Sequence, residues 1–326
     1  MTMPPSTSVE SLNTAKKTLT EQTLLSNEAD DKFETMLIMP SGVNRVLEGG
    51  FRTKGLFKQH ETNKPLITVI TVVFNEAVSL EKTMLSVLNQ TYDNVEYIVI
   101  DGGSTDGTLD IIRQYDHAID YWVSEKDEGI YDAMNKGIGL ASGGWVNFMN
   151  SGDLFYSTTT LEKIVFKFKK KYSIVYGDVQ AFSKKYHFKE MKISRPVTAK
   201  NLIMKLPICH QATFVTLKAF KEVGLYDTNY KICADHDWLL KALMAGNQAT
   251  YVHQCIALNN RDGVSSVSLF KLQRERLTLA LLHFNDLKPM IYLMALIPFL
   301  KIPFIFLFRK LNLIYVTHRF KIIKKP

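Results

Sequence analysis

Val95-Glu96-Tyr97-Ile98-Val99-Ile100-Asp101-Gly102-Gly103-Ser104-Thr105-Asp106-Gly107 is the stretch that decides the fold. Residues 95–100 have the composition of a strand that is buried on both faces. The strand ends at Asp101, the glycine-rich segment 101–107 predicts a loop, and residues 108–115 predict a helix. A buried strand followed directly by a loop and a helix is the unit from which parallel sheets are built.

The same alternation continues on both sides of this unit. Strands are predicted at 66–74, 121–123 and 145–149, and helices at 79–89 and 130–141. The pattern indicates an α/β fold, Rossmann-like, with a mostly parallel sheet flanked by helices on both faces. Ligands in such sheets bind at the carboxyl ends of the strands, so the informative residues should follow the strands.

The alternation loosens after Asp153. We predict a basic amphipathic helix at 161–171, strands at 174–179 and 186–193, and helices at 199–206, 217–223, 234–245 and 267–284. The resulting domain division is a polar N-terminal extension at 1–64, an α/β domain at 65–265 with halves 65–153 and 154–265, and C-terminal helices at 266–326.

The composition excludes several classes of protein. The chain has 326 residues, 46% of them hydrophobic, which fits a globular protein with a substantial core. Its three cysteines are too few and too scattered for a disulfide framework, and they form no CxxC pair for zinc. Residues 1–30 lack the apolar run of a signal peptide, so we expect a cytoplasmic protein.

Carboxylates follow the predicted strands. Asp101 and Glu76 stand where a nucleotide base and ribose would need hydrogen-bond acceptors, whereas Asp106 is better explained as a helix cap. Asp153 closes Asn150-Ser151-Gly152-Asp153 and could hold a divalent cation beside a leaving diphosphate, although these four residues also suit a plain turn.

A second pair of carboxylates, Asp235 and Asp237, opens a predicted helix. A transfer that inverts a sugar carbon needs a carboxylate to take the proton of the accepting hydroxyl. Negative charge at a helix start also stabilises the helix dipole. We assign the catalytic role to Asp235 and a supporting role to Asp237.

Six motifs, in this order, resemble family 2 glycosyltransferases of the GT-A fold. They are Thr71-Val72-Val73-Phe74-Asn75-Glu76, residues 99–108, residues 124–137, Asn147-Phe148-Met149-Asn150-Ser151-Gly152-Asp153, His210-Gln211-Ala212-Thr213-Phe214 and the Asp235 segment. The resemblance spans residues 66 to about 260. It implies that residues 65–265 form the catalytic domain, in which 65–153 would bind the nucleotide-sugar and 154–265 the acceptor. Each motif alone is modest, but their order and spacing make a chance match very improbable.

The resemblance implies a role for each matching residue. Thr71, Val73 and Glu76 would line the nucleoside pocket, with Asp101 reading the base. Asp127, Asn135 and Lys136 would lie near the ribose or diphosphate. Asp153 would contact the metal, Mn²⁺ or Mg²⁺, and Asp235 would be the catalytic base. Many relatives carry acids where this chain has Asn150 and Gly152, which bears on how tightly a metal is held.

Residues 129–135 and the pair His210-Gln211 resemble the subgroup that builds bacterial surface polysaccharides such as capsule, O-antigen and exopolysaccharide. This implies a sugar donor carried by a nucleotide diphosphate, UDP by default. It also implies an acceptor that is a polyprenyl-diphosphate-linked or lipopolysaccharide glycan. Asn150, His210, Gln211 and Asp237 would then lie on the acceptor side or support the site.

The C-terminal segment favours a membrane surface. Residues 291–308 are almost wholly apolar and near bilayer-spanning length, but they contain Lys301 and two prolines. Seven Lys or Arg residues and no acid occupy 301–326, a charge that suits anionic headgroups. We expect a peripheral association with the inner face of the plasma membrane. A true span, or a helix buried in an oligomer such as a homodimer, is the alternative.

Two other classes of function compete with the enzyme. A nucleotide-sugar-binding subunit of a polysaccharide assembly complex, with weak catalysis, would explain the altered residues 150–153. A nucleic-acid-binding protein is disfavoured, because the positive charge adjoins apolar runs instead of alternating with exposed aromatics. A dehydrogenase is disfavoured because no G-x-G-x-x-G follows the first strand.

Overall fold

Four parallel strands form the part of the sheet that the sequence predicts. The computed structural model describes residues 20–21, 35–40, 45–59, 61, 64–183, 188–194, 196–198, 202–203, 206–260, 269–289 and 291–292. The four strands lie side by side in the order β6-β5-β4-β7. Their bounds are β4 (Ile67–Val73), β5 (Val95–Asp101), β6 (Tyr121–Glu125) and β7 (Trp145–Phe148). All four are buried over their whole length or almost all of it, as predicted.

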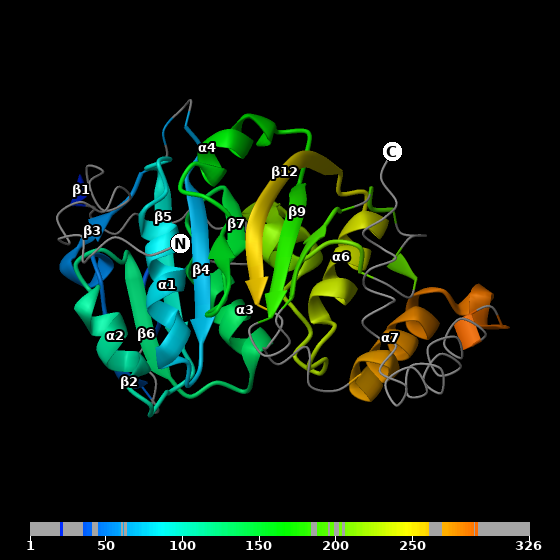
Figure 1. Ribbon diagram of the computed structural model, residues 1–326, viewed down its shortest axis with the longest axis horizontal. Coiled ribbons are helices and arrows are strands. Elements are labelled where there is room, and N and C mark those ends of the chain that lie inside the picture. Colours follow the sequence, from blue (N-terminus) through cyan, green and yellow to red (C-terminus); the bar gives the residue numbers. More distant parts are fainter. Residues whose placement is uncertain are drawn as a thin grey trace. The chain divides into compact units, whose positions relative to one another are not determined.

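Helices cover both faces of these strands (Figure 1). On β4, Val69 belongs to the core cluster with Leu80 and Met84 of α1 (Ala77–Leu88), whereas Ile70 meets Gly137 of α3 (Ile130–Leu140) on the opposite face. Successive strand residues point to opposite faces, so α1 and α3 sandwich the sheet. Helix α2 (Thr108–Gln114) packs beside α1. The predicted helices at 79–89, 108–115 and 130–141 are confirmed within two residues at each end.

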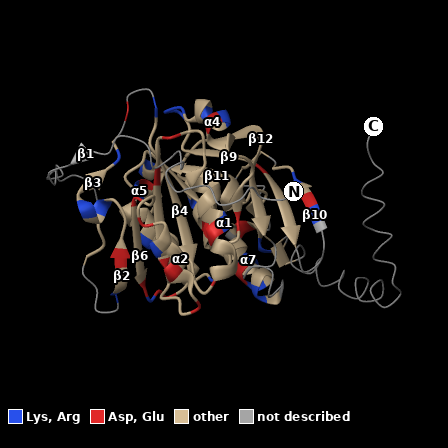
Figure 2. Cartoon of the chain, turned by 60° about the vertical axis from the view of Figure 1, so that its left-hand side comes forward, with Lys and Arg blue, Asp and Glu red and all other residues tan. Residues whose placement is uncertain are grey.

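The second half of the sheet is mixed. Beyond β7 the order continues β11-β9-β12-β8, with β9 antiparallel to β11 and parallel to β12. The bounds are β8 (Leu154–Phe155), β9 (Ile174–Ser183), β11 (Thr213–Thr216) and β12 (Ala249–Asn260), with β10 (Phe188–Lys192) paired to β9. Figure 2 shows β4, β11 and β12 free of Lys, Arg, Asp and Glu. The α/β class is confirmed, and the sheet is parallel from β6 to β7 and mixed beyond β7.

The predicted basic helix at 161–171 is wrong in length. Helix α4 covers only Thr160–Ile164 and passes into a single 3-10 turn, Val165–Lys167. The chain leaves helical geometry at Phe168, whose ring stacks on Trp145 at 4.4 Å between centroids. Burial of this aromatic ring against β7 stabilises the chain more than further turns of a charged, solvated helix would.

The N-terminal extension contributes to the sheet. Strand β2 (Arg45–Gly49) pairs antiparallel with β6, and the short β3 (Leu56–Phe57) pairs with β1 (Thr20–Glu21). Between β2 and β3, the 3-10 turn η3 (Arg52–Lys54) places the guanidinium of Arg52 on the buried carboxylate of Glu96. Burial alone opposes ionisation of Glu96, but Arg52 holds the pKa of that carboxyl below its usual range.

The remaining helices are α5 (Leu217–Val223), α6 (Ala234–Met244) and α7 (Leu269–His283), close to their predicted bounds. The chain divides into two compact units, residues 1–202 with 206–267, and residues 203–205 with 268–326. The second unit holds a small apolar cluster of Ile203, Ala280 and Ile291.

No helix within the described ranges combines the length and apolarity needed to cross a bilayer. Of the apolar segment 291–308, only residues 291 and 292 are among those described, and the predicted helix at 199–206 also falls largely outside them.

Candidate active site

The loops after β4, β5, β6 and β7 meet at one edge of the sheet. β4 lies between β5 and β7, and the chain winds outward from it in both directions, so ligands are expected at the carboxyl ends of these strands. Asn75, directly after β4, has a φ of +50°, which few non-glycine residues adopt. Its side-chain oxygen accepts a hydrogen bond from Thr105 N at 2.8 Å, which ties the first loop to the second.

Asp101 is fully buried at this edge. One of its oxygens accepts hydrogen bonds from Ser104 N at 3.1 Å and Ser124 Oγ at 2.6 Å, and the other accepts from Ser104 Oγ. These three hydrogen bonds hold Asp101 in place and fix the loop after β5. The contact of Asp101 with a nucleotide base stays a prediction.

Asp127, Phe74 and Gly102 lie close together next to Asp101. A Cβ built on Gly102 would lie 2.4 Å from Asp127 Oδ2 and 3.3 Å from Phe74 Cδ2, so the three residues are in close contact. Phe74 is 61% exposed, which is unusual for a large aromatic side chain. Burial, with smaller effects from Asp132 and Asp101, raises the pKa of Asp127. A flat apolar ring beside a carboxylate suits a nucleoside.

The other predicted nucleotide-binding residues divide into exposed and engaged ones. Glu76 is exposed, and its carboxylate accepts a hydrogen bond from Ser79 Oγ at 2.6 Å. Thr71 is fully buried, with its hydroxyl on Met149 O at 2.8 Å, and Val73 is nearly as buried. The side-chain amide of Asn135 clamps both backbone groups of Tyr226 at 2.9 Å. The side chains of Thr71 and Asn135 are thus engaged within the protein, and Val73 is buried in β4.

Lys136 is already paired. Its ammonium lies 2.9 Å from Glu125 and 3.4 Å from Asp132, and these acids raise its pKa although burial opposes the charge. The predicted contact of Lys136 with a diphosphate would therefore compete with two carboxylates.

Asp153 lies buried where β7 and β12 end. Its Oδ2 accepts from Gln211 Nε2 at 2.7 Å, and its Oδ1 accepts from Asn260 N at 2.7 Å and Asn259 Nδ2 at 3.3 Å. Burial raises the pKa of Asp153 to about 6, against the lowering by these donors and by nearby His210. The carboxylate thus carries a proton more readily than an exposed one.

Oxygen atoms without a partner surround Asp153. Among the described residues, the buried oxygens Asn150 Oδ1, Ser151 Oγ and Asn259 Oδ1 accept no hydrogen bond. Hard cations such as Mg²⁺ and Mn²⁺ prefer carboxylate, amide and hydroxyl oxygens, and Mg²⁺ often uses one or two carboxylates plus substrate phosphates. No cluster of three His, Cys, Asp or Glu side chains exists in the described parts of the chain. The residues present therefore fit a cation that is shared with a bound diphosphate.

Asp235 sits in the first turn of α6 within a network of donors. His210 Nδ1 lies 3.3 Å from Asp235 Oδ2, and His236 N donates to Oδ1 at 2.9 Å. Tyr131 Oη lies 3.3 Å from the same Oδ1 and 2.7 Å from Ile232 O. Burial alone would raise the pKa of Asp235, but the hydrogen bond and charge of His210 bring it below its usual range. The carboxylate is thus held ionised, as a base must be.

His210 and Gln211 occupy one 3-10 turn, η6 (His210–Ala212), and face different carboxylates. His210 contacts Asp235, while Gln211 contacts Asp153. The other ring nitrogen of His210 lies 3.2 Å from Asn150 Nδ2. Asp237 is buried and pairs with Lys241 at 2.6 Å, one turn along α6. The structure thus brings Asn150, Asp153, His210, Gln211 and Asp235 together, and places Asp237 in helix α6 beside them.

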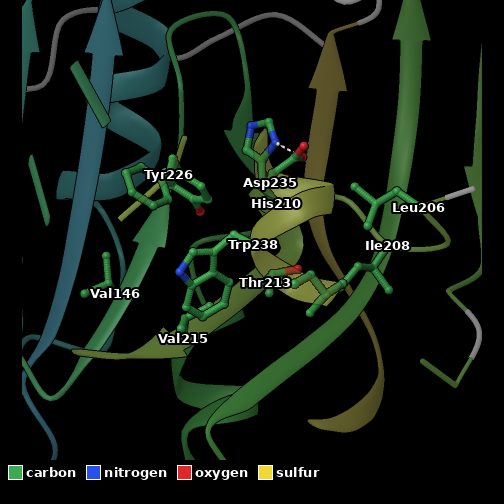
Figure 3. A pocket seen from close by; sticks show the side chains of 11 residues that line it. Val146, Leu206, Ile208, His210, Thr213, Val215, Tyr226, Asp235 and Trp238 are labelled. Carbon is green, nitrogen blue, oxygen red and sulfur yellow. Dashed lines mark hydrogen bonds and ion pairs between the residues drawn. The ribbon is translucent and has the colours of Figure 1, made fainter. Parts of the chain in front are cut away.

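An apolar pocket opens beside Asp235 and His210 (Figure 3). Aliphatic and aromatic side chains from β7, β11, α6 and the segment before η6 line it. They are Val146, Phe148, Leu206, Ile208, Val215, Tyr226, Trp238 and Leu239, with Thr213.

Sequence reasoning missed several residues of the site. Phe74 belongs to the motif at 71–76. Its aromatic side chain, directly after a buried strand, could have indicated a place at the ligand edge of the sheet. Tyr131 likewise stood in a quoted motif, but nothing in the sequence indicated its contact with a residue 104 positions away. Asn259 and Asn260 ended a strand that was not predicted.

Comparisons with known proteins agree with this architecture. Residues 68–224 match the family described as Glycosyl transferase family 2. A PGL/p-HBAD biosynthesis glycosyltransferase of Mycobacterium tuberculosis is 31% identical over 205 residues, which cover 61% of this chain and 78% of the relative. Glycosyltransferase AglE of Haloferax volcanii is 28% identical and covers 59% of this chain and 66% of the relative.

Solved structures show the same fold. S. aureus TarS 1-349 in complex with UDP-GlcNAc matches with a TM-score of 0.52 at 18% identity, covering 66% of each chain. The chain spans only 39% of the longer TarS structure. A mannosyltransferase of Pyrobaculum calidifontis in complex with GDP-Man and Mn²⁺ matches with a TM-score of 0.50 at 18% identity, covering 72% of this chain and 70% of that one.

The mixed sheet and its flanking helices match the GT-A fold of these solved structures. The chain belongs to glycosyl transferase family 2 and is therefore a glycosyltransferase, an enzyme of the transferase class.

Proposed function

We propose that the protein is an inverting glycosyltransferase, with Asp235 as its base. It would transfer a sugar from a nucleotide-diphosphate sugar, UDP by default, to a hydroxyl of a lipid-linked glycan. The accepting hydroxyl gives its proton to Asp235 as its oxygen bonds to the anomeric carbon. The bond from that carbon to the diphosphate breaks, and the nucleoside diphosphate leaves with the electron pair. The observation that carries this proposal is turn η6, which links Asp235 to Asp153 through neighbouring residues.

The donor would lie across the edge formed by the loops after β4, β5 and β6. Phe74 offers an exposed ring for stacking on the base, and Asp127 and Glu76 offer carboxylates for base and ribose groups. Asp153, with oxygens of Asn150, Ser151 and Asn259, would hold Mn²⁺ or Mg²⁺. When bound, such an ion neutralises charge on the diphosphate.

The proposed acceptor is a polyprenyl-diphosphate-linked or lipopolysaccharide glycan at the inner face of the plasma membrane. The basic C-terminal segment supports a membrane surface. We propose that residues 65–265 form the catalytic domain and that residues 266–326 attach it to the membrane. A homodimer is a further proposal for this protein.

Asp235→Asn tests the catalytic assignment. The variant keeps the size and most hydrogen bonds of the side chain but cannot accept a proton, and a general base contributes roughly 10²- to 10⁴-fold. We expect transfer to fall by this factor, while UDP affinity, measured by calorimetry, stays within about two-fold. Unchanged turnover would remove Asp235 from the base role. Nucleotide-sugar binding by a wild-type chain that transfers to no lipid-linked acceptor would favour the non-catalytic subunit instead.

Deletion of residues 288–326 tests the membrane attachment. The truncated chain should stay in the supernatant when it is centrifuged with anionic phospholipid vesicles, whereas the full chain should sediment. Neutral vesicles are the matched control, because attraction to basic residues needs anionic headgroups. Equal sedimentation of both chains with anionic vesicles would contradict the assignment.

A further inference from the structure

Two side chains outside helix α6 lie within hydrogen-bond distance of Asp235 among the described residues. His210 Nδ1 is 3.3 Å from Asp235 Oδ2 (Figure 3), and Tyr131 Oη is 3.3 Å from Asp235 Oδ1. The other donor to Oδ1 is His236 N, which belongs to the next residue of the same helix and moves with it. The direction of the carboxylate relative to the rest of the protein therefore depends on His210 and Tyr131.

Tyr131 is itself fixed in place by the fold. Its Oη donates to Ile232 O at 2.7 Å, and its ring, 7% exposed, lies 5.6 Å from the ring of Tyr226 between centroids. One turn further along α3, the side-chain amide of Asn135 binds both backbone groups of Tyr226 at 2.9 Å. Residues four apart lie on the same face of a helix. Helix α3 therefore holds the segment that leads into α6 at two points, and one of them is next to Asp235.

The hydroxyl of Tyr131 is not an alternative base. Burial and the nearby charge of Asp235 raise the pKa of Tyr131 well above its usual value. The phenol therefore keeps its proton while Asp235 is ionised, and that proton has two acceptors within reach, Ile232 O and Asp235 Oδ1. A neutral hydroxyl in this place can orient a carboxylate, but it is far too weak a base to take a proton from a sugar hydroxyl.

Helix α3 also begins at the edge where the donor is proposed to bind. In the loop before the helix, Asp127 Oδ1 accepts a hydrogen bond from Gly129 N at 2.9 Å. Asp132, in the first turn, accepts from Glu128 N at 3.1 Å, which fixes the loop to the helix. Tyr131 is the second residue of α3. One rigid element therefore carries the carboxylate on the donor side and the hydroxyl that contacts the base.

We propose that Tyr131 is a positioning residue, which holds the carboxylate of Asp235 in a fixed place relative to the bound donor. This inference rests on the proposed function, in which Asp235 takes the proton of the accepting hydroxyl. The oxygen of that hydroxyl must stand in line with the bond that breaks, so a small rotation of the carboxylate slows the reaction. Without the hydroxyl of Tyr131, Asp235 keeps one contact outside its own helix, that with His210.

Tyr131→Phe tests this role, because it keeps the ring and its packing on Tyr226 and removes only the hydroxyl. A displacement of about 1 Å can cost roughly 100-fold in rate, so we expect kcat for transfer to fall about ten- to 100-fold. KM for the donor and the calorimetric affinity for UDP should stay within about two-fold, because Phe74 and Asp127 are unchanged. An unchanged kcat would overturn the proposal, and so would a loss that appears only in KM for the donor.

Tyr92→Phe is the matched control. Tyr92 is also 7% exposed, and its hydroxyl also donates to a backbone carbonyl, that of Pro65. This bond lies just before the start of β4, at the end of the strand opposite the site. Each variant loses one hydrogen bond of a buried tyrosine, but Tyr92→Phe should keep the kcat of the wild type. An equal fall of kcat in both variants would assign the effect to stability and overturn the positioning role.

A double variant separates this inference from the proposed function. If the hydroxyl acts through Asp235, adding Tyr131→Phe to Asp235→Asn should lower the residual transfer by no more than about two-fold, because the group that it orients is already absent. A further loss of about ten-fold would show that Tyr131 acts independently of Asp235 and would overturn the assignment. Undiminished turnover of Asp235→Asn would overturn the proposed function, and this inference with it. Lost turnover in Asp235→Asn beside a wild-type kcat in Tyr131→Phe would overturn this inference alone.

Discussion

Replacing Asp153 by asparagine should change how stability depends on pH. The folded chain holds the proton of Asp153 up to about pH 6, because burial disfavours the charge, whereas the ordinary pKa is 3.8. The difference is about two pH units, and at 1.36 kcal/mol each it corresponds to roughly 3 kcal/mol. Asp153 is 6% exposed, so solvent screening reduces this figure little.

The sign follows from the proton count. Between pH 4 and pH 6 the folded chain holds a proton that the unfolded chain has lost, so the free energy of unfolding falls as pH rises through this window. Below pH 4 both states are protonated, and above about pH 6.5 both are ionised, so the contribution is flat on either side. The amide that replaces the carboxyl group does not titrate. Relative to wild type, the Asp153→Asn variant should therefore gain about 3 kcal/mol between pH 4 and pH 7.

Urea unfolding followed by circular dichroism at half-unit pH steps measures this difference. Other buried acids titrate in both proteins and cancel, so only the pH-dependent part of the difference is assigned to Asp153. A constant offset would reflect repacking around Asn259 and Gln211 and leaves the argument intact. A difference that is flat from pH 4 to pH 7, or that changes in the opposite direction, would refute the reasoning from burial.

Three further changes test the donor edge and the N-terminal segment. Phe74→Ala should weaken UDP binding about ten-fold or more, because base stacking contributes roughly 1–3 kcal/mol, and an unchanged calorimetric affinity would remove the ring from the site. Gly102→Ala should also lower UDP affinity, since its Cβ would come within 2.4 Å of a carboxylate oxygen, whereas Gly144→Ala, with no atom within 4 Å, should not. Arg52→Ala should destabilise the fold by about 3–5 kcal/mol by leaving a buried carboxylate unpaired. Lys54→Ala breaks a largely exposed pair and should cost under about 1 kcal/mol in the same urea titration.

The sequence predicted the first half of the sheet well because its signals there are local. A run such as residues 67–73 is β-branched throughout and mostly apolar, and the helices between strands show their own apolar spacing. Strand β12 gave no such pattern. Its residues alternate irregularly between exposed and buried, and its pairing with β9 shifts register around Cys255. Neither the period of a strand nor that of a helix survives such a shift.

The positions of the candidate site residues could be predicted, but their contacts could not. The sequence places Asp153 after a strand and Asp235 at a helix start, and the structure has both residues there. The partners of a carboxylate are often distant in sequence, such as Asn260 for Asp153. Asp101 is a further case, because its position at a strand end does not indicate that Ser104 and Ser124 donate to it.

The pair His210-Gln211 has a physical reason that the sequence alone did not supply. A 3-10 turn advances about 120° per residue, so neighbouring side chains point in clearly different directions. In η6 this sends His210 toward Asp235 and Gln211 toward Asp153, across 25 and 58 positions of sequence. One short turn, fixed to β7 by the bond from Asn147 Nδ2 to Gln211 O, therefore contacts both carboxylates. A shift of this turn would disturb the contacts of Asp153 and Asp235 together.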